Sequence, residues 1–344
     1  MKNSLLIVCA AFALSLTSCD TESTDYTPQN SFTEVDSKAS RQPATNLNGS
    51  KVYVSSNNSG QIGVYDVADG NTMPSMSTLN VPYADADGVV YDANRDALYQ
   101  VNRSDSKLVA FSEISGAMDG DMISPSAMGP STFSNGREAT LYNNKVVVVD
   151  DVSPGKFSSY HVNDENISDF RSYDVDFEVW GIQVTGKDLW AIEDADNKLA
   201  YFKDFFRAKS GALASTMSVS IEGLVRTHGL NYDANSDIMV LTDIGSAGSA
   251  DDGALVIITD FINTYNAAGD GGTISLDDQI RIEGASTELG NPVDVVVNAA
   301  KNAIYVAERA QNKFLIFEIP QDNCNCAPIY STEFMGASAV TTDF

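Results

Sequence analysis

Short runs of alternating apolar and polar residues recur along the chain, and turns rich in Gly, Asn and Asp separate them. The clearest pair of runs is 88–92 followed by 97–101, and the same order returns at 292–297 and 303–307. Alternation with a period of two predicts β-strands that bury one face, whereas an amphipathic helix needs a period near 3.6. Because no segment after residue 50 shows a sustained helical period, the pattern predicts an all-β domain.

The β-rich runs form a repeat whose second strands can be aligned on one position. That position holds Tyr53, Tyr99, Val147, Trp190, Met239 and Tyr305, at steps of 46, 48, 43, 49 and 66 residues. Steps of 43 to 49 residues fit a four-stranded β-propeller blade, while the last step requires an insertion or an additional repeat. Between 260 and 291 only one good strand is evident, at 273–282, so we predict six blades rather than seven.

The two ends of the repeat predict how the ring closes. No first strand precedes Tyr53, but the final residues 339–344 have the pattern of the missing strand, with Asp343 at the position of Asp92 and Asp233. A C-terminal strand that completes the first blade would leave no exposed edge between the chain ends. We therefore expect removal of the last eight residues to be far more damaging than removal of thirty residues near the N-terminus.

The blade pattern resembles that of the NHL and TolB-like six-bladed propellers. Its marks are Gly or Pro before the first strand, Tyr-Asp or Val-Asn at its end, and Leu-Tyr or Ile-Tyr-Val-Ala in the second strand. The best match is the blade at 291–319, particularly 304–313, and the resemblance covers most of the chain after residue 50. Propellers of this plan include lactonases, esterases, lyases and binding scaffolds, so the resemblance implies a fold and leaves the function to the site.

The N-terminus has the features of a bacterial lipoprotein signal. Lys2 precedes an apolar stretch at 5–16, which is too short to span a bilayer as a mature helix. The following Leu16-Thr17-Ser18-Cys19 resembles a lipobox, in which the peptide is cut before a cysteine whose thiol receives diacylglycerol. The alternative is an ordinary signal peptide with a chance cysteine.

These features divide the chain into a signal peptide at 1–18, a lipidated N-terminus and flexible tether at 19–50, and the propeller at 51–344. The tether is rich in Ser, Thr, Asp, Asn and Gln, a composition that cannot bury enough apolar surface to order itself. We expect attachment to the outer membrane through acyl chains on Cys19, including palmitate. The acidic residues after Cys19 leave open whether the propeller lies on the periplasmic or the cell-surface face.

Charge and cysteine content narrow the partners. The chain carries 21 Lys and Arg against 47 Asp and Glu, a net charge of −26, which argues against nucleic acid as a partner. After loss of Cys9 and lipidation of Cys19, only Cys324 and Cys326 remain, either as free thiols or as a local disulfide. With no histidine nearby they do not indicate a zinc site. We expect the protein to be a monomer.

The candidate site lies where the inner strands begin, on the face that also receives the ends of the second strands. There the repeat alignment places chemically diverse side chains around the axial channel. The predicted ligand-binding residues are Asp85, Asp87, Arg137, Glu138, Glu178, Trp180, Arg226, His228 and Asn291. Together they predict a polar pocket with an aromatic wall, suited to a small ligand or a divalent cation. At the second-strand ends we expect turn-capping carboxylates at Asp151, Asp194, Asp243 and Glu308.

Two functions fit these residues. The first is a membrane-anchored binding protein or scaffold that recognises a protein, peptide or glycan through the channel face, without catalysis. The second is a metal-dependent lactonase of the gluconolactonase-like type, with Ca²⁺ or another divalent cation on Asp87, Glu138 and Asn291 and with His228 as the base. The sequence favours binding, because the first blade lacks the Glu-Gly-Pro opening of that family and no residue is a confident nucleophile. His161, the other histidine, lies in a predicted outer strand.

Overall fold

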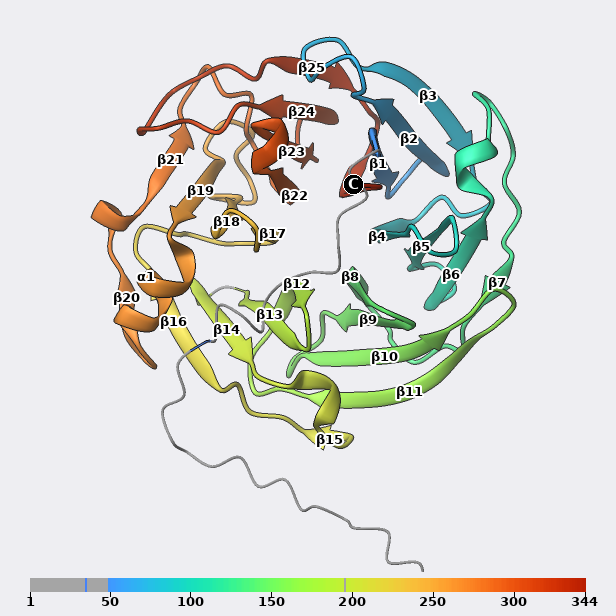
Figure 1. Ribbon diagram of the computed structural model, residues 1–344, viewed down its shortest axis with the longest axis horizontal. Helices are drawn as coiled ribbons and strands as arrows, with labels where there is room; N and C mark the ends of the chain where they lie inside the picture. The colour runs from blue at the N-terminus through green and yellow to red at the C-terminus, as the bar shows by residue number, and fades with distance from the viewer. Residues whose placement is uncertain (1–34, 36–48, 195) are drawn as a thin grey trace, which may run out of the picture. The chain divides into compact units, whose positions relative to one another are not determined.

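The computed structural model describes residues 35, 49–194 and 196–344, all within one compact unit that spans 32–344. Six β-sheets form a ring around a central axis (Figure 1). The predicted signal peptide, Cys19 and the other tether residues up to 48, except Val35, lie outside the described residues. None of the described helices is long and apolar enough to cross a membrane.

Each blade consists of four antiparallel strands ordered from the axis outward. In blade 1 these are β26 (Ala337–Thr342), β1 (Lys51–Ser56), β2 (Gln61–Asp66) and β3 (Ser75–Asn80), and in blade 2 β4 (Ala86–Asp92), β5 (Ala97–Asn102), β6 (Lys107–Ser112) and β7 (Ala127–Met128). Blade 3 contains β8 (Gly136–Tyr142), β9 (Lys145–Asp150), β10 (Lys156–Val162) and β11 (Ile167–Asp174), and blade 4 β12 (Val179–Thr185), β13 (Asp188–Glu193), β14 (Lys198–Phe202) and β16 (Met217–Ile221). Blade 5 contains β17 (Leu230–Asp233), β18 (Ile238–Asp243), β19 (Ala254–Thr259) and β21 (Ile280–Glu283), and blade 6 β22 (Pro292–Asn298), β23 (Ala303–Glu308), β24 (Lys313–Phe317) and β25 (Tyr330–Glu333).

Two short strands extend the sheets of neighbouring blades. Strand β15 (Gly211–Ala212) adds to β11 and β20 (Thr273–Ile274) adds to β16, both in parallel. Because each comes from the chain of the following blade, these strands join blade 3 to blade 4 and blade 4 to blade 5. The described elements also include four short 3₁₀ helices: η1 (Ile114–Gly116), η2 (Phe205–Arg207), η3 (Leu276–Asp278) and η4 (Ala299–Lys301).

The structure confirms the all-β, six-bladed ring and its closure. All six aligned positions lie in second strands, and β26 pairs with β1 along the register from Val52 with Thr342 to Ser56 with Ala337. Asp343 accepts a hydrogen bond from the backbone N–H of Lys51 at 2.9 Å, which ties the two ends together.

The long step between blades 5 and 6 contains an insertion and no seventh blade. It forms helix α1 (Phe261–Ala268), which the sequence analysis did not predict. Eight residues are too few to establish a helical period in the sequence. The single strand expected at 273–282 is instead divided into β20, η3 and β21. Apolar clusters fill the spaces between adjacent blades, and Trp190 is among the largest fully buried side chains.

Candidate functional site at the channel mouth

Five of the six inner strands have a β-bulge near their first residue. A bulge inserts a residue into one strand and redirects side chains from the regular alternation. The bulged positions include Asp87, Glu138 and Trp180, which the repeat alignment had placed at the channel mouth, and the equivalent Ser338 and Val293 of blades 1 and 6. The bulges therefore present unlike side chains at equivalent positions around the axis.

Glycines beside the bulges let neighbouring inner strands approach closely. A Cβ on Gly88 would lie 2.5 Å from the carbonyl oxygen of Arg137, and one on Gly181 would lie 2.3 Å from that of His228. Only glycine avoids these clashes. The polar side chains of adjacent blades are thereby brought together at the axis.

Asp87 is the centre of an arginine cluster drawn from three blades. Its carboxylate accepts hydrogen bonds from Arg137 at 3.2 Å and from Arg309 at 3.0 Å, and Arg103 lies 3.9 Å away. The side chain of Asp87 is only 2% exposed, whereas those of the three arginines are 12 to 24% exposed. The negative charge is therefore beneath the guanidinium groups, which face the solvent side of the mouth.

Asp194 holds a fourth arginine in the same manner. Arg226 donates from Nε and from the terminal amine to the two carboxylate oxygens, at 3.0 and 2.8 Å. This bidentate pairing fixes the plane of the guanidinium and raises the pKa of Arg226. The Asp194 side chain is 1% exposed and that of Arg226 is 36% exposed.

The capping expectation is right for two of the four second-strand carboxylates. Glu308 accepts backbone hydrogen bonds from Gly290, Asn291, Ala310 and Gln311, and Asp243 accepts them from Val225, Arg226 and Gly245. It is wrong for Asp194, which pairs with Arg226, and for Asp151, which accepts hydrogen bonds from the side chains of Asn135 and Arg137. In both cases a nearby guanidinium offers a stronger, charge-assisted bond than a backbone N–H.

Trp180 and His228 form an aromatic stack at the mouth. Their ring centroids are 3.7 Å apart with an interplanar angle of 7°, and the Arg137 guanidinium lies 3.9 Å from the Trp180 ring. Trp180 is 7% exposed, so it offers less surface to a ligand than the predicted aromatic wall required. It acts instead as a platform that positions Arg137 and His228.

His228 is neutral at physiological pH. Burial lowers its pKa to about 2, and the positive charges of Arg226, Arg309 and Arg137 contribute to the shift. Its Nε2 is 3.8 Å from an Asp194 oxygen, and neither ring nitrogen has a hydrogen-bond partner among the described residues. A neutral imidazole with both nitrogens unpaired can donate one hydrogen bond and accept another.

A carboxyl pair lies at the start of β8 and β22. Burial raises the pKa of Glu138 well above its usual value, and the charge of Asp294 raises it further. Burial also raises the pKa of Asp294 to about 7, although the backbone N–H groups of Val340 and Val295 donate to its carboxylate. The two side chains are hydrogen-bonded to each other, so one of them carries a proton near neutral pH.

Two of the three expected cation ligands, Asp87 and Glu138, have other contacts. Asp87 is paired with guanidinium groups, and Glu138 is bonded to Asp294. Among the described residues no group of three or more His, Cys, Asp or Glu side chains is arranged to hold a metal ion. This donor set does not fit Ca²⁺, because a cation on Asp87 would face two arginines.

The remaining predicted residues lie at the rim. Asp85 bonds to Arg103 at 3.3 Å, and the exposed Glu178 contributes its carbonyl oxygen to the Asp194 N–H. His161, on β10, packs against Phe170 with ring centroids 4.3 Å apart, as expected for a side chain away from the mouth. Cys324 and Cys326 form a disulfide, one of the two states that the sequence left open.

Unpaired polar atoms gather at the mouth. The buried side-chain nitrogens and oxygens there that lack a described partner belong to Arg103 (Nε), Thr227 (Oγ1), His228 (Nδ1 and Nε2), Asn291 (Oδ1) and Arg309 (Nε). Buried polar groups without partners are costly and uncommon in proteins. Six of the fourteen such atoms of the described residues belong to this face, and most of the six can donate, which favours a ligand rich in acceptors.

The predicted ligand-binding residues lack three members of this site, Arg103, Arg309 and Asp294. Arg103 and Arg309 follow the ends of their second strands, as Asp151 and Asp194 do. Including that position from every blade would have added both arginines. Asp294 gave no such signal, because its place depends on the bulge in β22, which the apolar pattern does not reveal.

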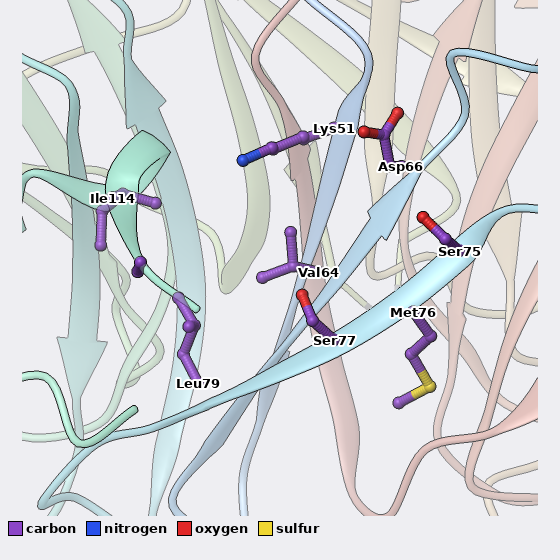
Figure 2. Close-up of a pocket in the computed structure, with 9 residues that line it drawn as sticks. Lys51, Val64, Asp66, Ser75, Met76, Ser77, Leu79 and Ile114 are labelled. Atoms are coloured by element: carbon purple, nitrogen blue, oxygen red, sulfur yellow. The ribbon is translucent and has the colours of Figure 1, made fainter. Parts of the chain in front are cut away.

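A separate cavity of about 220 Å³ lies at blade 1 (Figure 2). Figure 2 shows side chains of β1–β3 around it, including Lys51, Asp66 and Met76, with Ile114 of η1 opposite. Its charged lining consists of one lysine and one aspartate. It lacks the buried, unpaired donors of the channel mouth, which remains the stronger candidate site.

No known family model matches the chain, and no curated protein matches its sequence. Solved structures nevertheless share its fold. A chain from the crystal structure of a nidogen–laminin complex aligns with a TM-score of 0.60 at 12% identity, over 86% of this chain and 99% of that one. A putative 6-phosphogluconolactonase from Bacteroides fragilis aligns with a TM-score of 0.58 at 11% identity, over 88% and 99%. These similarities identify a six-bladed β-propeller and leave its ligand open.

Proposed function

We propose that the protein is a membrane-anchored binding propeller that recognises an anionic group, a carboxylate or a phosphate, at the channel mouth. The supporting observation is the cluster of unpaired buried donors beside four arginines, in a chain whose net charge is −26. Buried Asp87 and Asp194 orient these guanidinium groups before a ligand arrives. Such preorganisation reduces the entropy cost of binding.

Arg309 provides the sharpest test of anion recognition. Arg309→Gln leaves Asp87 paired with Arg137 and removes one charged donor from the mouth. We expect affinity for inorganic phosphate or a uronate to fall by about 10- to 100-fold, as for loss of one charge-assisted hydrogen bond. Titration followed by tryptophan fluorescence measures this, because Trp180 stacks on His228 beside Arg137.

Arg207→Gln is the matched control, since Arg207 is 67% exposed and lies on η2, outside the mouth. It should bind as the wild type does. Equal affinity of the Arg309→Gln variant and the wild type, at unchanged melting temperatures, would contradict the proposal.

Anchoring is a separate part of the proposal, supported by the lipobox at residues 16–19. Cys19→Ser removes the acyl acceptor, and we expect the variant to leave the membrane fraction while its propeller still folds. A high-salt wash screens charge contacts without extracting acyl chains. Retention of the variant on washed membranes, measured by immunoblot, would refute the lipid anchor.

The lactonase alternative receives support from the fold of the putative 6-phosphogluconolactonase alone. The geometry does not favour it. A histidine with a pKa of about 2 is a weak general base near pH 7, and two of the three predicted cation ligands, Asp87 and Glu138, are paired with arginines and with Asp294. Hydrolysis of a lactone panel that required His228 would restore this alternative.

A further inference from the structure

Val35 is a buried residue within the segment that the sequence predicts to be a flexible tether. It is 3% exposed and belongs to the apolar cluster between blades 4 and 5, together with Trp190, Leu230 and Ile262. Burial of an apolar side chain of this size is favourable. Val35 thus makes a buried contact that the composition of the segment did not predict.

Both backbone groups of Val35 are bonded to one side chain of the inserted helix. The Val35 N–H donates to Oδ1 of Asn266 at 2.8 Å, and Nδ2 of Asn266 donates to the Val35 carbonyl oxygen at 3.1 Å. The partners are 231 positions apart in sequence. A side-chain amide thus pairs with the peptide groups as a neighbouring strand would.

The insertion builds the rest of this site. Phe261, Ile262 and Tyr265 of α1 are buried in the same cluster, and the Tyr265 hydroxyl donates to the carbonyl oxygens of Leu199 and Met217 in blade 4. Helix α1 is consequently fixed across the gap between two blades, and Asn266 is the next residue after Tyr265. The blade pattern itself does not require this helix, since the other blades are completed within shorter steps.

We infer that α1 is a docking site for the N-terminal segment of the same chain, with Val35 as the residue that it recognises. The Asn266 amide binds the backbone N–H and carbonyl groups of Val35, and the apolar cluster accommodates its branched aliphatic side chain. The site is distinct from the channel mouth, so the inference does not depend on anion binding.

Docking shortens the attachment of the propeller to its lipid, a consequence that rests on the proposed acylation of Cys19. From Cys19 to Val35 there are 16 residue steps, against 30 from Cys19 to Gly49. At about 3.5 Å per extended residue, the maximum reach falls from about 105 Å to about 55 Å. The attachment point also becomes the edge of blades 4 and 5.

Asn266→Ala in the full-length chain tests the dock, with Asn263→Ala as its matched control on the same helix. Asn263 bonds only locally, to Asp260, among the contacts of the described residues. Trypsin can cut after Lys38 and Arg41, close to the docked residue. We expect Asn266→Ala to accelerate these cuts at least tenfold and Asn263→Ala to leave their rate unchanged, because proteolysis follows the population of the open form.

Hydrogen exchange at the Val35 amide gives a second measurement that needs no cleavage. The amide should be protected in the wild type and should exchange at least tenfold faster in Asn266→Ala and in Val35→Asp, while the blade strands keep their protection. An unprotected Val35 amide in the wild type, or equal cleavage in the wild type and Asn266→Ala, would overturn the inference. The inference would also be overturned if Asn266→Ala lost protection throughout the propeller while the amide of residue 35 stayed protected in Val35→Asp.

Discussion

Truncation after Gly336 is expected to abolish cooperative folding of the propeller. The deletion removes β26, the inner strand of blade 1, and leaves β1 with an open edge at the axis (Figure 1). It also removes the buried side chains of Ala337, Ala339 and Val340 and the Val340 N–H that donates to Asp294. Domain stability is typically about 5 to 15 kcal/mol, and the lost strand pairing and burial together approach that total.

Thermal unfolding followed by circular dichroism measures this effect, together with the soluble yield. Deletion of residues 20–31 is the control, because it removes more residues but none from the compact unit at 32–344. We expect a wild-type transition for the control and none for the truncation. Adding a peptide of residues 337–344 should restore part of the transition. A truncated chain that melts cooperatively near the wild-type temperature would show that β26 does not lock the ring.

The blades were predictable because each repeats one local pattern that burial enforces. A second strand lies between two others and packs on both faces, so it is buried throughout, as in the strands of Tyr99 and Tyr305. Its apolar residues are therefore required whatever the ligand is. Closure was predictable for the same reason, since a missing first strand must come from the other chain end. Neither inference needed information beyond the spacing of apolar residues.

The site was only partly predictable, because its chemistry depends on contacts between blades. The alignment placed Asp87 and Arg226 at the mouth, but sequence spacing could not reveal that their partners come from other blades. In sequence, a carboxylate that follows a strand resembles a turn cap. In the structure Asp194 instead pairs with Arg226, which comes from the next blade. Helix α1 and the docking of Val35 were not predicted, because each occurs once in the chain and no repeat alignment can reveal it.

The carboxyl pair formed by Glu138 and Asp294 should make the propeller less stable as the pH rises from about 4 to about 7. In the unfolded chain both groups have ordinary pKa values near 4, whereas burial raises both in the folded state, that of Asp294 to about 7. Over this range the unfolded state releases protons that the folded state keeps. The stability contributed by the protonated pair is thus fully present below about pH 4 and is lost as the pH passes through 7.

Glu138→Gln should remove the part of this dependence that comes from Glu138, because the glutamine amide can donate to Asp294 as the protonated carboxyl does, but it cannot ionise. The variant should therefore be more stable than the wild type at pH 8. Melting temperatures between pH 5 and 8 measure this difference. We expect the wild type to lose several degrees over that range and Glu138→Gln to lose fewer.

The matched control is Glu318→Gln, at an exposed position, which should follow the wild-type curve. The variant comparison separates this pair from the many surface carboxylates, whose mutual repulsion also grows as the pH rises. Both variants lack one carboxyl group, so the comparison between them allows for the loss of one group from the chain. If Glu138→Gln and Glu318→Gln have the same pH slope, Glu138 does not keep a proton in the folded state that the unfolded state releases.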